Sequence, residues 1–213
     1  TEEIDTIVLI SVINLNILPL DKWENKLLKN IFDVVFSILF FVTIGFWLLP
    51  IIWILVRITS KGPVIYKQER WGLNNKPIIC YKFRTMYIND IQEGFDQTSR
   101  HDPRITPLGN ILRKFSLDEL PQFINVLKGD MSLVGPRPLL TQYLTRYTPE
   151  QTRRHNVRPG ITGWAQVNGR DELPISQKVA LDAEYLQRKG FWFDIKILWL
   201  TFLKVMQRDG VSH

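Results

Sequence analysis

The longest uninterrupted apolar stretch of the chain runs from Val34 to Val56 and contains no charged residue. It exceeds the roughly 20 residues with which an α-helix crosses the hydrocarbon core of a membrane, and a buried helix of a soluble protein is the minor alternative. Pro50 removes a backbone donor, which kinks a helix, and Gly45 loosens the preceding turn. Lysines and arginines flank both ends, whereas a simple crossing concentrates them on one side. Two interpretations stay open: a spanning helix with a proline kink, and a helix that enters the membrane, bends and returns to the same face.

Shorter patterns predict the remaining elements. A basic, aromatic segment contains two strand-like runs joined by the turn sequence GLNN, which indicates a β-hairpin with strands at 63–68 and 77–84. A polar loop follows at 87–107, helical periodicity returns at 108–128, and two late helices are expected at 176–189 and 191–208. The predicted fold class is therefore α+β and predominantly helical.

The last of these helices has a mixed character. Lys196, Lys204 and Arg208 recur at four- or eight-residue spacing in an otherwise apolar and aromatic sequence. A helix with a narrow basic stripe can lie in a membrane interface. A core helix whose basic residues line one exposed edge fits the pattern equally well.

Composition shifts the balance towards a lipid partner. The chain has 27 Lys and Arg against 21 Asp and Glu, and its formal charge of +6 suits an anionic partner such as phospholipid, phosphate or nucleic acid. Its 7 Trp and 12 Phe exceed what a small core requires, and aromatic rings concentrate at membrane interfaces. Nucleic acid is disfavoured because the basic residues flank the apolar stretch instead of forming one soluble face.

The single cysteine, Cys80, excludes an intramolecular disulfide and is expected to be a buried strand residue.

Candidate chemistry centres on the sequence Ser116-Leu117-Asp118-Glu119. One interpretation is structural: a capping box in which Ser116 caps a helix and Glu119 reaches back to it. Helical periodicity nevertheless leaves Asp118 and Glu119 on the polar side of the predicted helix. Proline is tolerated only near the start of a helix, so Pro121 places the two acidic residues in the first turn, where free backbone N–H groups favour negative charge. Asp118 could then attack phosphorus as a carboxylate nucleophile, and Glu119 could hold Mg²⁺, which favours oxygen ligands and neutralises phosphate charge.

Two further segments suit phosphate or nucleotide binding. In the segment GPRP, two prolines fix the backbone around the guanidinium of Arg137, which is a candidate phosphate clamp, although an ordinary turn with a surface arginine looks similar. The segment 158–170 combines glycines and a tryptophan between Arg158 and Arg170, which suits a loop that approaches a planar ligand closely. The common nucleotide-binding and hydrolase motifs do not occur in the sequence.

Taken in order, several of these segments resemble one family, the monotopic phosphoglycosyl transferases, also called bacterial sugar transferases, and in particular the PglC-type enzymes. The resemblance extends from about Lys29 to Ser212. It rests on the blocks FDVV, SKGPVIYKQERWGL, YKFRTM, SLDELPQFINVLKGDMSLVGPRPLL and VRPGITGWAQVNGR.

The resemblance implies a monotopic protein of the bacterial inner (cytoplasmic) membrane, with a re-entrant helix broken at Pro50, a small β-hairpin and amphipathic interfacial helices. Residues 22–60 would form the membrane-embedded region and 61–213 a catalytic domain on the cytoplasmic face. Residues 1–21 would be an N-terminal extension, a remnant of the additional domains of larger relatives. One departure is Leu49, where family members often carry serine before the proline.

By the same resemblance the chain moves a sugar 1-phosphate from a UDP-sugar to polyprenyl (undecaprenyl) phosphate and releases UMP, the first membrane step of glycan assembly. Asp118 is implied as the nucleophile of a covalent phosphosugar intermediate, and Glu119 as a Mg²⁺ ligand. The other implied substrate-binding residues are Lys82 and Arg137 near the phosphates, Asp182 in the late helix, and Arg158 and Arg170 towards the nucleotide.

The sequence leaves the donor sugar and the assembly state open. The short segment after Arg170 favours the compact relatives that act on N-acetylated sugars, and transfer of a hexose 1-phosphate such as glucose or galactose is the alternative. A non-catalytic membrane scaffold is a second alternative, against which the intact Asp118, Glu119 and Arg137 argue. A homodimer through the aromatic helices is compatible with the sequence, but no feature specifies one.

Overall fold

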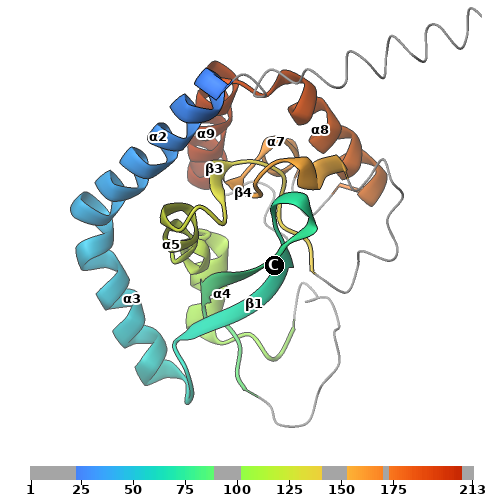
Figure 1. Cartoon of the computed structure of the whole chain (residues 1–213). Helices are drawn as coiled ribbons and strands as arrows, with labels where there is room; N and C mark the ends of the chain where they lie inside the picture. Colours follow the sequence, from blue (N-terminus) through green and yellow to red (C-terminus); the bar gives the residue numbers. More distant parts are fainter. Residues whose placement is uncertain (1–22, 89–101, 141–152, 170–172, 208–213) are drawn as a thin grey trace, which may run out of the picture.

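The computed structural model describes residues 23–88, 102–140, 153–169 and 173–207. In these ranges a long bent helix runs along one side of a body built from short helices and two small sheets (Figure 1). Each sheet has only two strands. The described chain is therefore mostly helical, as the sequence predicted.

The long helix consists of α2 (Trp23–Phe40), a π-helical turn (Phe41–Gly45) and α3 (Phe46–Thr59). Among the described residues, Trp23–Thr59 is the one helix that is long and apolar enough to cross a membrane. Only 11% of its most apolar stretch of 18 residues is buried. Such exposure fits side chains that lie in lipid and disfavours the core helix of a soluble protein.

The bend between α2 and α3 coincides with the π-helical turn rather than with Pro50 (Figure 1). The backbone N–H of Phe46 donates to the carbonyl of Phe41, five residues earlier, and this widens the turn. Gly45 permits the bend, because a Cβ there would lie 3.1 Å from the ring of Phe41 and 3.2 Å from that of Phe40. Helix α3 continues through Pro50, so the irregular turn precedes the proline. The return of the helix to the same membrane face remains a prediction.

The predicted hairpin is confirmed. Strands β1 (Ile65–Trp71) and β2 (Pro77–Phe83) pair antiparallel. In the turn between them Asn74 and Asn75 adopt left-handed φ angles of 53° and 56°. Asparagine tolerates this conformation better than most residues, which explains the turn sequence. The first strand begins and ends later than predicted.

The segment predicted as helical at 108–128 is divided into α4 (Pro107–Lys114), a 3₁₀ turn (Leu117–Glu119) and α5 (Gln122–Leu127). Ser116 interrupts it with a φ of 55°, a left-handed value uncommon for serine. The Ser116 side chain makes no capping hydrogen bond, so the capping-box interpretation is wrong. The 3₁₀ turn that carries the two acidic residues, hereafter the acidic turn, therefore lies between two helices.

The C-terminal half contains a second sheet, in which β3 (Ser132–Val134) and β4 (Gly160–Thr162) pair parallel. A short helix, α7 (Trp164–Val167), precedes α8 (Ile175–Arg188) and α9 (Phe191–Gln207), which match the two predicted late helices closely. Helix α9 exposes four large apolar side chains, those of Trp192, Trp199, Phe202 and Met206. This exposure is compatible with a helix in a membrane interface.

Buried ion pairs and hydrogen bonds attach the long helix to the second sheet and to α9. Asp33 of α2 is 1% exposed; its carboxylate accepts from the backbone N–H of Leu133 at 3.1 Å and lies 3.5 Å from the guanidinium of Arg158. One turn earlier, Lys29 forms an ion pair with the buried Asp194 of α9. Charges removed from water persist only when they are paired, so these contacts fix the position of α2 on the body.

The main apolar core lies between the hairpin, α5, the second sheet and the late helices. Its fully or nearly buried members are Cys80, Phe123, Val126, Met131, Leu133, Val134, Val167, Tyr185 and Ile197. Cys80 is a buried strand residue, as predicted, and burial raises the pKa of its thiol to about 11. The thiol therefore stays protonated at neutral pH and is unreactive.

A buried amide sets the position of the hairpin against α5. Asn125 is fully buried; its Nδ2 donates to the carbonyl of Ile79 at 2.6 Å, and its Oδ1 accepts from the N–H of Tyr81 at 3.1 Å. The side chain thus binds β2 as a neighbouring strand would. Lys82 is consequently held beside the acidic turn that precedes α5.

Asn125→Ala is expected to lower the melting temperature of the detergent-solubilised protein by roughly 5 °C. The substitution leaves two partly buried backbone groups of β2 without their side-chain partner, and a total cost of about 1–3 kcal/mol shifts the melting temperature of a chain of this size by several degrees. Differential scanning fluorimetry measures the shift. Asn110→Ala, at an exposed position of α4, is the matched control and should change the melting temperature by less than about 1 °C. Equal shifts in the two variants would show that the Asn125 contacts contribute nothing.

Candidate active site

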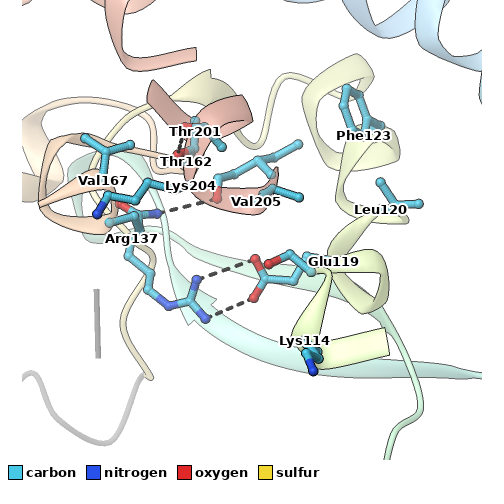
Figure 2. A pocket seen from close by; sticks show the side chains of 13 residues that line it. Lys114, Glu119, Leu120, Phe123, Arg137, Thr162, Val167, Thr201, Lys204 and Val205 are labelled. Carbon is cyan, nitrogen blue, oxygen red and sulfur yellow. Dashed lines mark hydrogen bonds and ion pairs between the residues drawn. The ribbon is translucent and has the colours of Figure 1, made fainter. Parts of the chain in front are cut away.

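A pocket lies between the acidic turn and α5 on one side and the β4–α7 segment and α9 on the other (Figure 2). Its charged lining residues are Lys114, Glu119, Arg137 and Lys204. Its apolar lining residues are Leu120, Phe123, Ile161, Val167 and Val205. The pocket therefore offers charge and apolar surface together.

Glu119 is the electrostatic centre of this pocket, although it is only 6% exposed. Its Oε1 accepts from Nζ of Lys82 at 2.8 Å and from Nη2 of Arg137 at 2.9 Å. Figure 2 shows the guanidinium of Arg137 pointing at the carboxylate. The fold thus brings together three of the residues singled out in the sequence, one from a strand, one from a turn and one from a loop.

The backbone that carries Arg137 is fixed on both sides. The N–H of Gly160 donates to the carbonyl of Pro136 at 3.0 Å. The two segments approach so closely that a Cβ on Gly160 would lie 2.1 Å from the nitrogen of Gly135. From the other side, Arg154 donates to the carbonyl of Arg137 at 2.9 Å. The guanidinium of Arg137 is therefore presented from a rigid support.

Positive charge exceeds negative charge around Glu119. Arg70 of β1 is partly buried near Arg137, and burial together with the charge of Arg137 lowers the pKa of Arg70 to about 10. Arg70 remains protonated at neutral pH. Lys82 and Arg137 contact the carboxylate directly, Arg70 adds positive charge from farther away, and two lysines of the pocket lining add to the excess. Such an excess suits a ligand with several negative charges, such as a diphosphate.

Asp118 is adjacent to Glu119 but lies in different surroundings. It is 9% exposed and is not among the described residues that line the pocket. Burial lowers the pKa of the Arg113 guanidinium, and the negative charge of Asp118 opposes this shift. Arg113 is held in place by the hydroxyl of Thr85, to which it donates at 2.9 Å. The acidic pair is thus more enclosed than its predicted place on a polar helix face suggested.

The acidic turn can hold a magnesium ion only together with substrate oxygens. No group of three or more Asp, Glu, His or Cys side chains converges within the described part of the chain. Mg²⁺ is often held by one or two carboxylates plus the phosphates of its substrate. Glu119, with Asp118 beside it, meets this limited requirement.

Asp182 lies behind the pocket rather than in it. It is 2% exposed, and its Oδ2 lies 2.8 Å from Nη2 of Arg154, the residue that supports the backbone of Arg137. Burial raises the pKa of Asp182 to about 6, and the charge of Arg154 opposes this shift. The neighbouring His155 is also buried, and burial and the charge of Arg154 lower its pKa to about 4. In this arrangement Asp182 supports Arg137 through Arg154.

Of the two arginines predicted to contact the nucleotide, the structure describes only Arg158. Arg158 is held by Asp33 and Asn30 on α2 and is not among the residues that line the pocket, whereas Arg170 lies outside the described residues. Arg158 thus serves the attachment of the long helix. Its contact with a nucleotide remains a prediction.

Sequence reasoning missed two residues that the structure places in supporting positions, Arg154 and Asp33. A signal existed for Asp33, because it is the last charge before the long apolar stretch, and a carboxylate at such a place needs a partner. No local pattern distinguishes the buried Arg154 from its exposed neighbour Arg153. Its role depends on a partner in α8, distant in the sequence.

Asp182 and His155 are expected to give opposite pH dependences of stability. Asp182 has a higher pKa in the folded state, about 6, than in the unfolded state, about 3.9, so its contribution falls as the pH rises through this window. His155 has a lower pKa in the folded state, about 4, than in the unfolded state, about 6.5, so its contribution rises. Relative to the native protein, Asp182→Asn should therefore make the slope of the unfolding free energy against pH more positive between about pH 4 and 6, and His155→Gln should make that slope less positive. Denaturant titrations over this range measure both, and parallel profiles would contradict the assignment.

Comparisons with known proteins identify relatives over most of the chain. A family model described as bacterial sugar transferase matches residues 24–208. The uncharacterized sugar transferase EpsL of Bacillus subtilis is 46% identical over 187 residues, which cover 88% of this chain and 91% of that protein. The UDP-glucose:undecaprenyl-phosphate glucose-1-phosphate transferase of Escherichia coli is 45% identical over 84% of this chain. The undecaprenyl-phosphate galactose phosphotransferase of Salmonella typhimurium is 40% identical over 90% of it.

The extent of these matches differs between the relatives. The chain spans only 40% of the Escherichia coli protein and 43% of the Salmonella protein, whereas it covers nearly all of EpsL. The region matched by the family model includes the bent helix, the hairpin and every residue that lines the pocket. The resemblance found in the sequence motifs is thus confirmed, and the chain belongs to the bacterial sugar transferase family.

Proposed function

We propose that the chain transfers a hexose 1-phosphate from a UDP-hexose to a polyprenyl phosphate at a membrane surface. The observation that carries the proposal is the position of Glu119 between Lys82 and Arg137, in a pocket with excess positive charge and next to Asp118. A helix able to enter a membrane borders the same body. This combination suits a reaction between a charged, soluble nucleotide-sugar and a lipid phosphate.

The printed names of the relatives favour a hexose over the N-acetylated sugar expected from the sequence. The Escherichia coli relative is named for glucose and the Salmonella relative for galactose, both with undecaprenyl phosphate. EpsL, which this chain matches nearly end to end, is named for no sugar. Glucose and galactose are therefore our first donor candidates.

In the proposed reaction, a carboxylate oxygen of Asp118 attacks the phosphorus that bears the sugar. An Asp118–phosphorus bond forms, the bond to the UMP oxygen breaks, and UMP leaves with that electron pair. A phosphate oxygen of the polyprenyl phosphate then attacks the same phosphorus. The Asp118–phosphorus bond breaks, the carboxylate is restored, and the sugar is joined to the lipid through a diphosphate.

The neighbouring groups stabilise charge in this scheme. Arg137 and Lys82 bind the non-bridging phosphate oxygens, and Arg70 adds positive potential from behind them. A magnesium ion held by Glu119 and the phosphates would neutralise part of the charge on the leaving UMP. Arg154 and Asp182 keep the backbone of Arg137 in place. Lys82 and Arg137 are paired with Glu119 in the structure, so they must be shared with or transferred to the substrate phosphates on binding.

The bent helix gives the site a membrane position. We place the catalytic body at the cytoplasmic face of the bacterial inner membrane, because UDP-sugars are made in the cytoplasm and the basic residues at both ends of the helix suit the anionic inner leaflet. The non-catalytic scaffold alternative is disfavoured, since a scaffold has no need of an enclosed carboxylate held by two cations.

Intact-protein mass spectrometry tests the covalent step. Nanodisc-held protein mixed with Mg²⁺ and UDP-glucose or UDP-galactose is expected to gain the mass of one hexose phosphate, and Asp118→Asn is expected to gain none. Asp102→Asn, which removes another buried carboxylate, is the control for loss of fold and should still form the adduct. Steady turnover by Asp118→Asn would exclude Asp118 as the nucleophile.

A donor panel tests the sugar. UMP release in the presence of undecaprenyl phosphate is expected to be at least about tenfold faster, per unit donor concentration, with UDP-glucose or UDP-galactose than with UDP-N-acetylglucosamine, because one misfit contact in a sugar site costs on the order of 1–3 kcal/mol. The comparison uses kcat/KM values measured under one set of conditions. A preference for the N-acetylated donor would restore the expectation drawn from the sequence.

A further inference from the structure

The apolar part of the pocket is a poor match for a nucleotide-sugar. The charged groups around Glu119 account for a diphosphate, but Leu120, Phe123, Ile161 and Val205 also line the same pocket. A UDP-hexose carries hydroxyls and charges over most of its surface, and burying these against apolar side chains is unfavourable. The apolar wall therefore favours an occupant with a hydrocarbon portion.

Phe123 connects this wall to the membrane helix. Its ring stacks on that of Phe40 with centroids 4.0 Å apart and meets the ring of Phe41 edge-on at 6.5 Å. Phe40 ends α2 and Phe41 begins the π-helical turn, so both belong to the bend of the helix that is able to enter a membrane. Apolar side chains are thus in contact from the bend to the pocket.

Helix α9 borders the pocket from the other side and has two different faces. Thr201, Lys204 and Val205 line the pocket, whereas Phe202 and Met206 are exposed at 55% and 67%. The same helix therefore offers an apolar surface to its surroundings and a charged, half-buried surface to the pocket. Figure 2 shows Lys204 and Val205 on one side of the pocket and Phe123 and Leu120 on the other.

We propose that this pocket binds the acceptor lipid, with the phosphate beside Lys114, Arg137 and Lys204 and the first isoprene units between Phe123 and Val205. The inference rests on the proposed function for the existence of a polyprenyl phosphate acceptor. A phosphate head joined to a branched hydrocarbon matches the charged and apolar parts of the pocket at once. The lipid reaches the reacting phosphorus from the side of the bend and α9, while the hydrophilic donor uses the side of Lys82 and Arg70.

Lipid binding without donor tests this assignment directly. Undecaprenyl phosphate is added to the detergent-solubilised full chain and its dissociation constant is measured by native mass spectrometry. Val205→Phe, which fills the pocket, and Lys204→Gln, which removes a charge, should each weaken binding about tenfold, equivalent to about 1.4 kcal/mol. The matched controls on the same helix are Met206→Phe and Lys196→Gln, and both should change binding less than about twofold.

A second measurement separates the acceptor from the donor. In the turnover assay, Val205→Phe should raise the KM for undecaprenyl phosphate about tenfold and the KM for the UDP-hexose by less than about twofold. Undecaprenol, which lacks the phosphate, should bind at least about tenfold more weakly than undecaprenyl phosphate if the basic residues hold the head group.

The outcomes distinguish this inference from the proposed function. Unchanged lipid binding in Val205→Phe and Lys204→Gln overturns the acceptor site, and so does a rise confined to the KM of the UDP-hexose, which would make the pocket a donor site. Lipid binding that follows the expected pattern in a protein that never releases UMP from any donor would retain the acceptor site and overturn the transferase reaction.

Discussion

The buried ion pairs that join the long helix to α9 and to the segment before β4 are the constraint on which the site depends. Asp33 and Asp194 supply two carboxylates, and Lys29 and Arg158 two cations, so the charges compensate one another. The hydroxyl of Tyr185 adds a bond to Asp194 at 2.9 Å. Removing one partner would leave an uncompensated charge in a water-poor environment, which costs several kcal/mol.

These contacts also affect the position of the loop that carries Arg137 in the pocket. Asp33 binds the backbone of Leu133 in β3, and the same segment continues into the loop that carries Arg137. The attachment of the membrane helix and the placement of the phosphate-binding guanidinium therefore share one short strand. A shift of α2 relative to the body would move that strand, and the geometry around Glu119 would change with it.

The sequence predicted the elements that have a regular pattern and failed where a residue broke the pattern locally. The hairpin and the late helices were found because their periodicity and turn residues agree. The interruption at Ser116 was missed because the apolar spacing of Leu117, Leu120 and Phe123 is helical, whereas the backbone turns left-handed at Ser116 just before them. The bend was expected at Pro50 because proline is the residue that most visibly disturbs a helix, whereas the π-helical turn has no side-chain signature of its own.

In the candidate site, the sequence indicated which residues could take part in the chemistry, but it did not indicate which residues contact them. The motif around Asp118 and Glu119 and the rigid segment around Arg137 were recognised in the sequence, and the structure brings Glu119 and Arg137 into contact. The surroundings of Asp182 and Arg158 were not predictable, because their partners lie in distant segments and ion pairing leaves no local pattern. Both residues form ion pairs within the protein, and their contacts with substrate remain predictions.

The close approach of the loop before Arg137 to β4 restricts how this enzyme can be redesigned. A Cβ on Gly160 or Gly163 would lie 2.1 Å from a backbone atom of Gly135, so neither position accepts any other residue unless the main chain moves. A mutant library aimed at a new sugar or a new lipid should hold these glycines constant. Its diversity belongs on the walls, at positions such as Leu120 and Val205, whose side chains line the pocket.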